Sequence, residues 1–151
     1  ESGQLQCNMD PKSTIGILGS AHMHADFKVY INGKPINFAN SNYYMKSSFI
    51  HVDDNQNKED ASGVIHIHAT GVPLWVFFKS LDMDFTSECF KFEDKQYCNN
   101  FDNKLRLFVN GIESNQFENY IIKDMDKILI SYGNEDEIKQ QLNSITDYAK
   151  N

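Results

Sequence analysis

Four of the five histidines in the chain lie in two His-x-His pairs, and imidazole nitrogen is the commonest protein ligand for transition metals. The first pair is His22 and His24, and the second is His66 and His68. With the two-residue period of a β-strand, the members of each pair project from one face. Two such strands side by side would offer four nitrogens to one cation, so the sequence predicts a metal site. His51, near the end of a further predicted strand, is a fifth candidate ligand.

The predicted donor set suits copper or zinc, because calcium and magnesium prefer oxygen ligands. Copper(II) binds nitrogen ligands more tightly than zinc, so copper is the preferred ion and zinc the alternative. No cysteine lies near either histidine pair in the sequence, which argues against a blue-copper centre. Asp26 continues the row of His22 and His24. It is a possible ligand or a partner for Lys28, but a carboxylate that orients an imidazole or faces solvent is favoured.

The strand that carries the first pair has an apolar opposite face, which predicts a buried side. That face comprises Met23, Ala25, Phe27, Val29 and Ile31. Asn32-Gly33 then predicts a tight turn, because both residue types tolerate positive φ. Further strands are expected over 34–38 (at an edge, because of Pro35), over 48–52 and over 64–68, with a charged loop over 53–62.

Two helices are predicted. Pro73 followed by an apolar stripe of Leu74, Phe77, Phe78 and Leu81 favours a buried mid-chain helix, with a strand as the alternative. A C-terminal amphipathic helix is expected to be capped by Asn134 and to carry a stripe at 138, 142, 145 and 148 or 149.

The segment Leu105–Gly111 repeats the pattern of Phe27–Gly33, and residues 120–132 resemble 44–52 more loosely. The fold class expected is therefore α+β: a mostly antiparallel, barrel- or sandwich-like sheet of two pseudo-repeated strand-turn-strand halves with the two helices. Residues 1–19 are expected to be irregular, with a weak strand near 15–18 as the alternative, and 20–151 to form one metal-binding domain. The second half contains no histidine, so the metal site belongs to the first.

Composition narrows the class of protein. The 151 residues carry a net charge of −7, which argues against nucleic acid or an anionic membrane surface as partner. Cys89 and Cys98 are too far apart for a Cys-x-x-Cys redox motif and predict a disulfide, which implies an oxidising, extracytoplasmic compartment. Cys7 is left over as a free thiol, an intermolecular partner or the remnant of a lipid anchor. Glu1 is not a natural start, so a leader or membrane anchor is expected before it.

The order of motifs resembles a largely uncharacterised family of exported archaeal and bacterial proteins. Its bacterial members carry His-x-His, a Thr-His-Asp turn, Gly-Ile-Ile-His-Ile-Glu and a Leu-Gly-x-Phe-Phe helix. Here His22, His24 and His66 match, His51 matches loosely, and His68 replaces the glutamate. The resemblance covers about residues 20–134 and is closest to proteins of ammonia-oxidising archaea, whose copper-rich electron transport supports copper. Some members are labelled disulfide isomerases, a role that the cysteine spacing here does not support.

These observations predict an extracytoplasmic metal-binding protein that stores copper, delivers it or uses it to transfer electrons, with a redox or metal-delivery protein as partner. The first alternative is a zinc- or copper-dependent enzyme with three histidine ligands and an activated water, for which Asp26 or Asp53 would be the general base. The second is a structural interaction module in which the metal joins two strands. A thiol-disulfide oxidoreductase is the least favoured.

Overall fold

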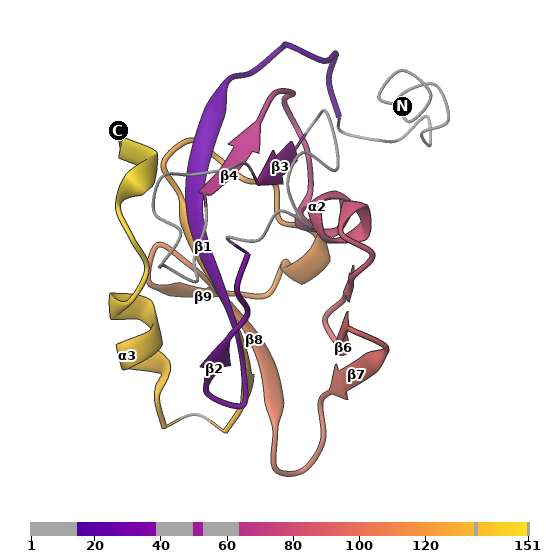
Figure 1. Cartoon of the computed structure of the whole chain (residues 1–151), viewed down its shortest axis with the longest axis vertical. Helices are drawn as coiled ribbons and strands as arrows, with labels where there is room; N and C mark the ends of the chain where they lie inside the picture. Colours follow the sequence, from indigo (N-terminus) through magenta and orange to yellow (C-terminus); the bar gives the residue numbers. More distant parts are fainter. Residues whose placement is uncertain (1–14, 39–49, 53–63, 135, 151) are drawn as a thin grey trace.

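The computed structural model describes residues 15–38, 50–52, 64–134 and 136–150 (Figure 1). The predictions for Cys7, for the turn and return segment over 40–49 and for the loop over 53–62 lie outside these residues. In the described part, segment 15–20 forms no strand. It lies instead against the end of the second histidine strand, where Gly16 N donates to Thr70 O (2.8 Å) and Gly19 N to His68 O (2.6 Å).

A seven-stranded sheet organises the molecule (Figure 1). Along the sheet its strands are β3 (Ile50–Val52), β4 (Val64–Ile67), β1 (Met23–Ile31), β10 (Lys127–Gly133), β8 (Lys104–Val109) and β9 (Ile112–Ser114), with β2 (Lys34–Pro35) also paired to β1. All pairs are antiparallel except β1 with β10, which run parallel at the centre. The fold is α+β and sandwich-like as predicted, and the described strands do not close into a barrel.

The two predicted halves share one turn geometry. Asn32 and Gly33 have φ of 51° and 82°, and Asn110 and Gly111 have φ of 53° and 83°. Two successive positive φ angles match the right-handed twist of the flanking strands, which is why Asn-Gly closes both hairpins. The last strands of the two halves, β3 and β10, differ in their pairing. β10 pairs with both β1 and β8, whereas β3 pairs with β4.

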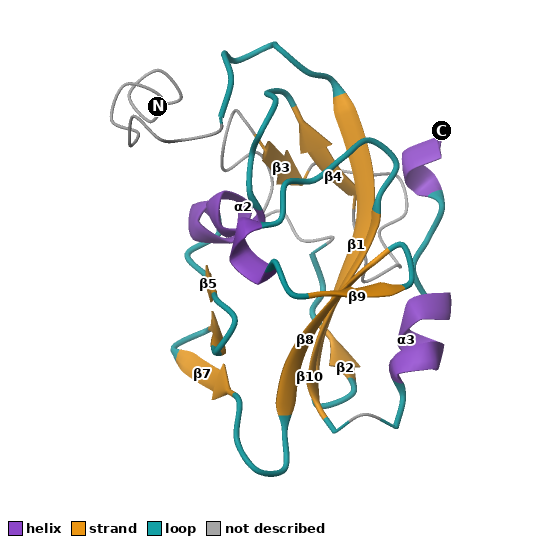
Figure 2. Ribbon diagram, turned by 180° about the vertical axis from the view of Figure 1, so that it is seen from behind, coloured by secondary structure: helices purple, strands orange, loops and turns teal. Residues whose placement is uncertain are grey.

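The core lies between the sheet and helix α2 (Leu74–Ser80), as the mid-chain apolar stripe predicts. Phe77 packs edge-on against Phe27 of β1, with ring centroids 5.4 Å apart, and neither side chain is more than 1% exposed. Pro73 is the residue before the helix rather than its first member. Figure 2 shows α2 and the C-terminal helix α3 (Ile138–Asn143) on opposite sides of the sheet.

A small second sheet extends from α2 and was not predicted. Its strands are β5 (Asp84–Phe85), β6 (Cys89–Phe92) and β7 (Lys95–Cys98). Cys89 and Cys98 face each other across β6 and β7 and form the predicted disulfide. The charged turn between them, Glu93-Asp94, has two positive φ angles (52° and 64°) without the glycine that normally announces such a turn.

The C-terminal segment covers the other face of the sheet. Ile145 packs with Phe108 and Leu129, and Ile138 and Leu142 lie beside them, so three positions of the predicted stripe pack together while 148 and 149 are not in this cluster. The prediction of its start was wrong, since Glu137 rather than Asn134 precedes the helix. The helix also ends at Asn143, and a separate 3-10 turn, η3 (Tyr148–Lys150), follows. A further 3-10 turn, η2 (Phe117–Asn119), precedes β10.

Among the described residues, the helices are too short and too polar to cross a membrane.

Candidate metal centre

The sheet register brings the histidine strands together. His24 of β1 pairs with His66 of β4, and His66 pairs in turn with His51 of β3. Residues directly opposite one another on neighbouring strands lie on the same side of the sheet, so three histidine positions form one row across three strands. His22 immediately precedes β1 and His68 immediately follows β4, and because these strands are antiparallel both lie at the same end of the sheet.

Four imidazole rings form a continuous chain at this end of the sheet. The ring centroids of His24 and His66 are 4.6 Å apart, those of His22 and His24 are 5.1 Å apart, and those of His22 and His68 are 5.5 Å apart. His22 is exposed and the other three are half-buried. The two predicted pairs are therefore brought together, at a place that solvent and ions can reach. We call these four residues, with the position of His51, the histidine row.

Two of the three ring separations, those of His24 with His66 and of His22 with His24, match the scale of a shared ion, whereas the His22–His68 separation of 5.5 Å is longer. With a metal–nitrogen bond of about 2.0 Å, two imidazoles on one ion at right or tetrahedral angles have centroids about 4.5–5.2 Å apart. The rings of His22 and His24, and those of His24 and His66, meet at 78°, so the edge of one faces the plane of the other. Among the described residues, no three His, Cys, Asp or Glu side chains are already arranged to hold an ion. Binding therefore requires the rings to rotate until their lone pairs converge.

Asp26 is not part of the histidine row, although it lies two residues further along the same strand face. Its side chain is 1% exposed, and its Oδ1 accepts hydrogen bonds from Thr146 Oγ1 (2.7 Å) and Tyr148 N (3.1 Å), while Oδ2 accepts one from Ala149 N (2.9 Å). Burial raises the pKa of the Asp26 carboxyl, and these hydrogen bonds oppose the rise. The expectation that Asp26 orients an imidazole or faces solvent was wrong. The side chain is buried, and its carboxylate oxygens accept hydrogen bonds from the C-terminal segment instead.

The C-terminal segment also explains why the histidines are accessible. Beyond Asp26 the same strand face continues with Lys28, which is 8% exposed, and Tyr30, whose hydroxyl lies 2.8 Å from Ser144 Oγ. The cover therefore runs from Tyr30 to Asp26 and ends there. The first two positions of this face, which are histidines, remain open.

Two further segments border the histidine row. On one side, residues 15–20 lie along His68 through the hydrogen bond from Gly19 N. On the other, the turn over 123–126 is joined to His24, because His24 N donates to Asp124 Oδ1 (3.1 Å) and Met125 N donates to His24 O (2.8 Å). No local pattern predicts these contacts of Asp124 and Met125, because both residues lie about a hundred positions from His24.

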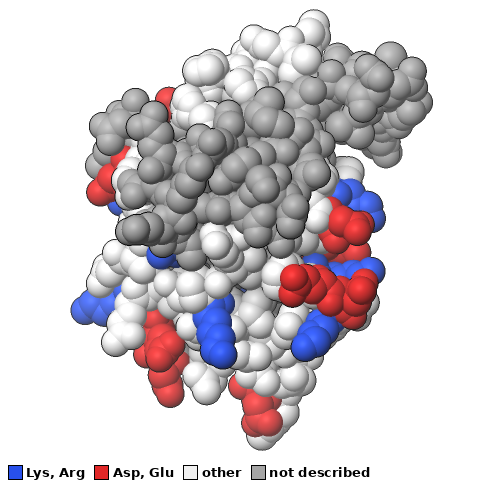
Figure 3. Space-filling view, in the orientation of Figure 1, with Lys and Arg blue, Asp and Glu red and all other residues white. Residues whose placement is uncertain are grey.

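The chain segment that borders the histidine row on its N-terminal side carries no charged residue. Residues 15–25 contain no Lys, Arg, Asp or Glu, and the upper end of the molecule in Figure 3 is correspondingly white. Lower on the same face, basic and acidic side chains are interspersed, with neither sign forming a continuous patch (Figure 3). Among the described residues, the N-terminal border of the histidine row is thus uncharged.

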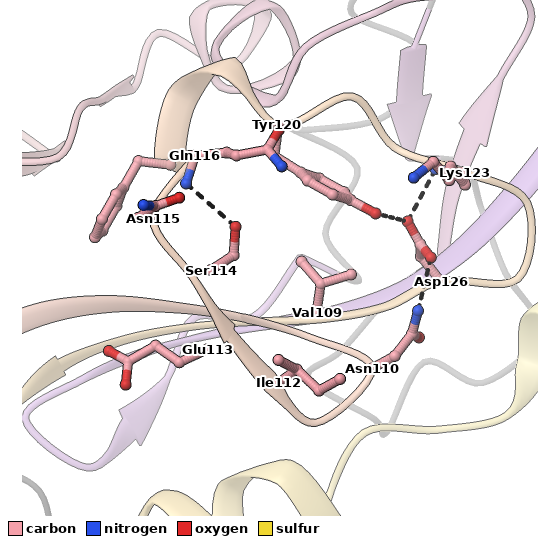
Figure 4. Close-up of a pocket in the computed structure, with 11 residues that line it drawn as sticks. Val109, Asn110, Ile112, Glu113, Ser114, Asn115, Gln116, Tyr120, Lys123 and Asp126 are labelled. Carbon is pink, nitrogen blue, oxygen red and sulfur yellow. Dashed lines mark hydrogen bonds between the residues drawn. The ribbon is translucent and has the colours of Figure 1, made fainter.

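An open depression of about 700 Å³ between β9, η2 and the 123–126 turn is a second candidate site (Figure 4). Its buried carboxylate, Asp126, accepts hydrogen bonds from Tyr120 Oη (2.5 Å), Asn110 Nδ2 (2.9 Å) and Lys123 N (2.9 Å). Burial, and then the bond to Asp126, raise the pKa of the Tyr120 hydroxyl, which keeps it protonated. These groups hold the turn in place, so the Asp126 carboxylate and the Tyr120 hydroxyl are committed to structural hydrogen bonds.

Comparison of the chain with protein-family models, curated proteins and solved structures gives no match. The family resemblance of the histidine motifs therefore stays a prediction, and the function must be argued from the site.

Proposed function

We propose that this chain is an extracytoplasmic metal-binding protein that holds copper, in preference to zinc, with histidines of the histidine row. The protein stores this ion, delivers it or uses it to transfer electrons. The observation that carries the proposal is the continuous chain of four imidazoles with centroid separations of 4.6–5.5 Å. Imidazoles gathered from opposed strands at a solvent-accessible end of the sheet are a common arrangement of transition-metal ligands.

The choice of copper follows from the donors. The row contains nitrogen ligands without a thiolate, and the cysteines of the described part are joined to each other in the second sheet. Copper(II) exceeds zinc in affinity for such a set, while zinc remains the competing ion wherever copper is scarce. The disulfide between Cys89 and Cys98 supports an oxidising compartment, where thiol-based copper buffering of the cytosol does not operate.

The enzyme alternative is less well supported, because one of its two proposed general bases is committed elsewhere. Asp26 accepts three hydrogen bonds from the C-terminal segment and cannot reach a metal-bound water without breaking them. Asp53, the other proposed base, lies outside the described residues. The donors are therefore better explained by a site that holds the ion than by a site that activates a water molecule.

The experiment is a metal competition on untagged protein, in which copper(II) and zinc are titrated against a chromophoric chelator and bound metal is counted by elemental analysis. We expect about one equivalent of copper, bound more tightly than zinc. In His24→Ala plus His66→Ala, which removes the closest pair of rings, copper affinity should fall at least about 100-fold. The control is Lys91→Ala plus Gln96→Ala, another cross-strand pair, in the second sheet.

Each outcome of this competition decides the proposal. Copper lost in the histidine variant and kept in the control supports it. Zinc held more tightly than copper overturns the copper preference, and equal affinities in the parent and the histidine variant overturn the site itself. Circular dichroism of the metal-free proteins separates loss of ligands from loss of fold.

A further inference from the structure

We propose that the thioether of Met125 is a ligand of the metal bound at the histidine row, and that it gives the site affinity for copper(I) as well as copper(II). This inference rests on the proposed function, since Met125 has no such role without an ion at the histidines. It assigns a ligand from the half of the chain that contains no histidine.

The first support is position. His24 lies two residues before Asp26 in β1, and Met125 lies two residues before Lys127, the residue that pairs with Asp26 in β10. The hydrogen bond from Met125 N to His24 O (2.8 Å) shows that the two residues remain neighbours beyond the end of the parallel pairing. The backbone of Met125 therefore lies beside His24, next in order after the positions of His51, His66 and His24 across the sheet.

The second support is exposure. Of the three methionines in the described part, Met83 is 2% exposed and Met23 packs partly buried against the core, whereas Met125 is 47% exposed. A methionine side chain usually fills gaps in apolar cores. At the surface it gains no such burial, so its sulfur is available to a ligand from solvent.

The third support is backbone conformation. Asp126 N donates to Lys123 O (3.2 Å), which makes Met125 the third residue of a four-residue turn, and its φ is 67°. Glycine or asparagine normally occupies such a position, because a Cβ atom is strained there. The turn is kept in place by Asp126, which accepts from Lys123 N and Tyr120 Oη (Figure 4). It is also held by Asp124, which accepts from His24 N. A strained, exposed residue held by surrounding contacts points to a function.

The chemistry is that of a mixed donor set. Imidazole nitrogens serve both oxidation states of copper, while a soft thioether selects copper(I) over zinc and over copper(II). A site with imidazoles and one thioether can therefore keep the ion through a change of oxidation state, which a protein that delivers copper or transfers electrons needs. No covalent step is involved.

The test compares two methionine-to-leucine substitutions, which keep size and apolarity but remove sulfur. Copper(I) affinity is measured anaerobically by competition with bicinchoninate, and copper(II) affinity with the chelator used above. We expect Met125→Leu to lose copper(I) affinity about 10- to 100-fold while copper(II) affinity changes less than about threefold. Met23→Leu is the matched control and should change neither. X-ray absorption of the copper(I) parent should show a sulfur neighbour that Met125→Leu lacks.

A further variant separates the ligand from the strain. Met125→Gly removes both the sulfur and the strained Cβ, so it should raise the melting temperature of the metal-free protein while still losing copper(I) affinity. If Met125→Leu binds copper(I) like the parent while His24→Ala plus His66→Ala loses both oxidation states, the ligand role of Met125 is overturned and the proposed function stands. If the parent binds no copper in either state, the proposed function fails, and this inference fails with it.

Discussion

The hairpins β1–β2 and β8–β9 have the same turn, but their first strands, β1 and β8, begin with different kinds of residue. When the two Asn-Gly turns are aligned, His24 corresponds to Asp102 and His22 to Asn100. Asn100 Oδ1 accepts from Asp102 N (2.9 Å) and Asn103 N (2.8 Å), so the second strand begins in a closed asparagine turn. The first begins in an open row of imidazoles. The turn determines how the hairpin folds, and the start of the strand is free to carry a site.

The neighbours of the two strand starts differ as well. β1 runs parallel to β10 and β8 runs antiparallel to it, so the two starts lie at opposite ends of the sheet (Figure 1). The start of β8 lies near the disulfide hairpin, where Tyr132 Oη donates to Cys98 O (2.9 Å) and Leu105 N donates to Asn99 Oδ1 (2.6 Å). The start of β1 has β4 on one side and the 123–126 turn on the other, and these bring potential ligands.

The sharpest way to break the comparison is to exchange the strand starts. His22→Asn plus His24→Asp gives the first hairpin the residues of the second, and copper(II) affinity should fall at least about 100-fold, because loss of even a supporting group costs 10- to 100-fold. Asn100→His plus Asp102→His, the reciprocal change, should add no site, because no histidine strand lies beside it. Competition titration measures both. A second copper equivalent in the reciprocal variant would show that the neighbours do not matter.

The next largest expected effect is on the free energy of unfolding. It compares Asp26 with Lys104, which takes the same position when the two Asn-Gly turns are aligned. Asp26→Ala leaves three hydrogen-bond donors of the C-terminal segment without their acceptor, so the free energy of unfolding should fall by about 3 kcal/mol. Lys104 is exposed, and Lys104→Ala should change it by less than about 0.5 kcal/mol. Urea unfolding measures both. Equal effects would mean that the C-terminal segment does not depend on Asp26.

Asp26 also predicts a pH dependence with a definite sign. Because its pKa is raised in the folded protein above the ordinary value of 3.8, the folded state holds the proton more tightly than the unfolded state. The contribution of Asp26 to stability is therefore greatest at acidic pH and falls as pH rises from the unfolded to the folded pKa. Subtraction of the Asp26→Ala stability curve from that of the parent should reveal this fall. A difference that grows with pH would reverse the assignment.

The two turn asparagines should differ by a smaller amount. Asn110 Nδ2 donates to Asp126 Oδ1, and Asn110 Oδ1 accepts from Lys127 N, each at 2.9 Å. Asn32 makes no side-chain hydrogen bond within the described part of the chain. Glycine adopts positive φ freely, so Asn110→Gly should cost about 1–2 kcal/mol for its two bonds and Asn32→Gly only a few tenths. Thermal unfolding of the two variants would contradict this if Asn32→Gly were the more damaging.

The sequence predicted those parts of the molecule whose signals are local. The alternation of apolar and polar residues around His24 and the Asn-Gly turns depend on neighbours along one strand, and both are confirmed. The contacts of Asp26 with the C-terminal segment and of Met125 with His24 could not be predicted, because each joins segments about a hundred positions apart. The small sheet was missed for another reason: its turn, Glu93-Asp94, uses positive φ without a residue type that predicts it. Pairwise register, not composition, decided which predicted ligands became neighbours.

The smallest expected change in the free energy of unfolding concerns the ion pair of Arg106 and Glu113 in the second hairpin. Arg106 donates to both carboxylate oxygens of Glu113, from Nε to Oε2 (2.9 Å) and from Nη2 to Oε1 (2.7 Å), and this lowers the pKa of Glu113. In the first hairpin Pro35 takes the position of Glu113, and Lys28 that of Arg106. Since the Glu113 side chain is half exposed, Glu113→Gln should cost only about 0.2–1 kcal/mol at neutral pH.

Its pH dependence has the opposite sign to that of Asp26. A pKa lowered below the ordinary value of 4.5 means that stability from Glu113 is complete above the unfolded pKa and is lost as pH falls through the folded pKa. The parent and Glu113→Gln should therefore converge in acid and separate on the way to neutral pH, where added salt should narrow the gap. If the gap persisted in acid, the packing of Arg106 over the Phe108 ring, 4.9 Å from its centroid, would be the stabilising contact, and the two hairpins would differ in packing rather than in charge.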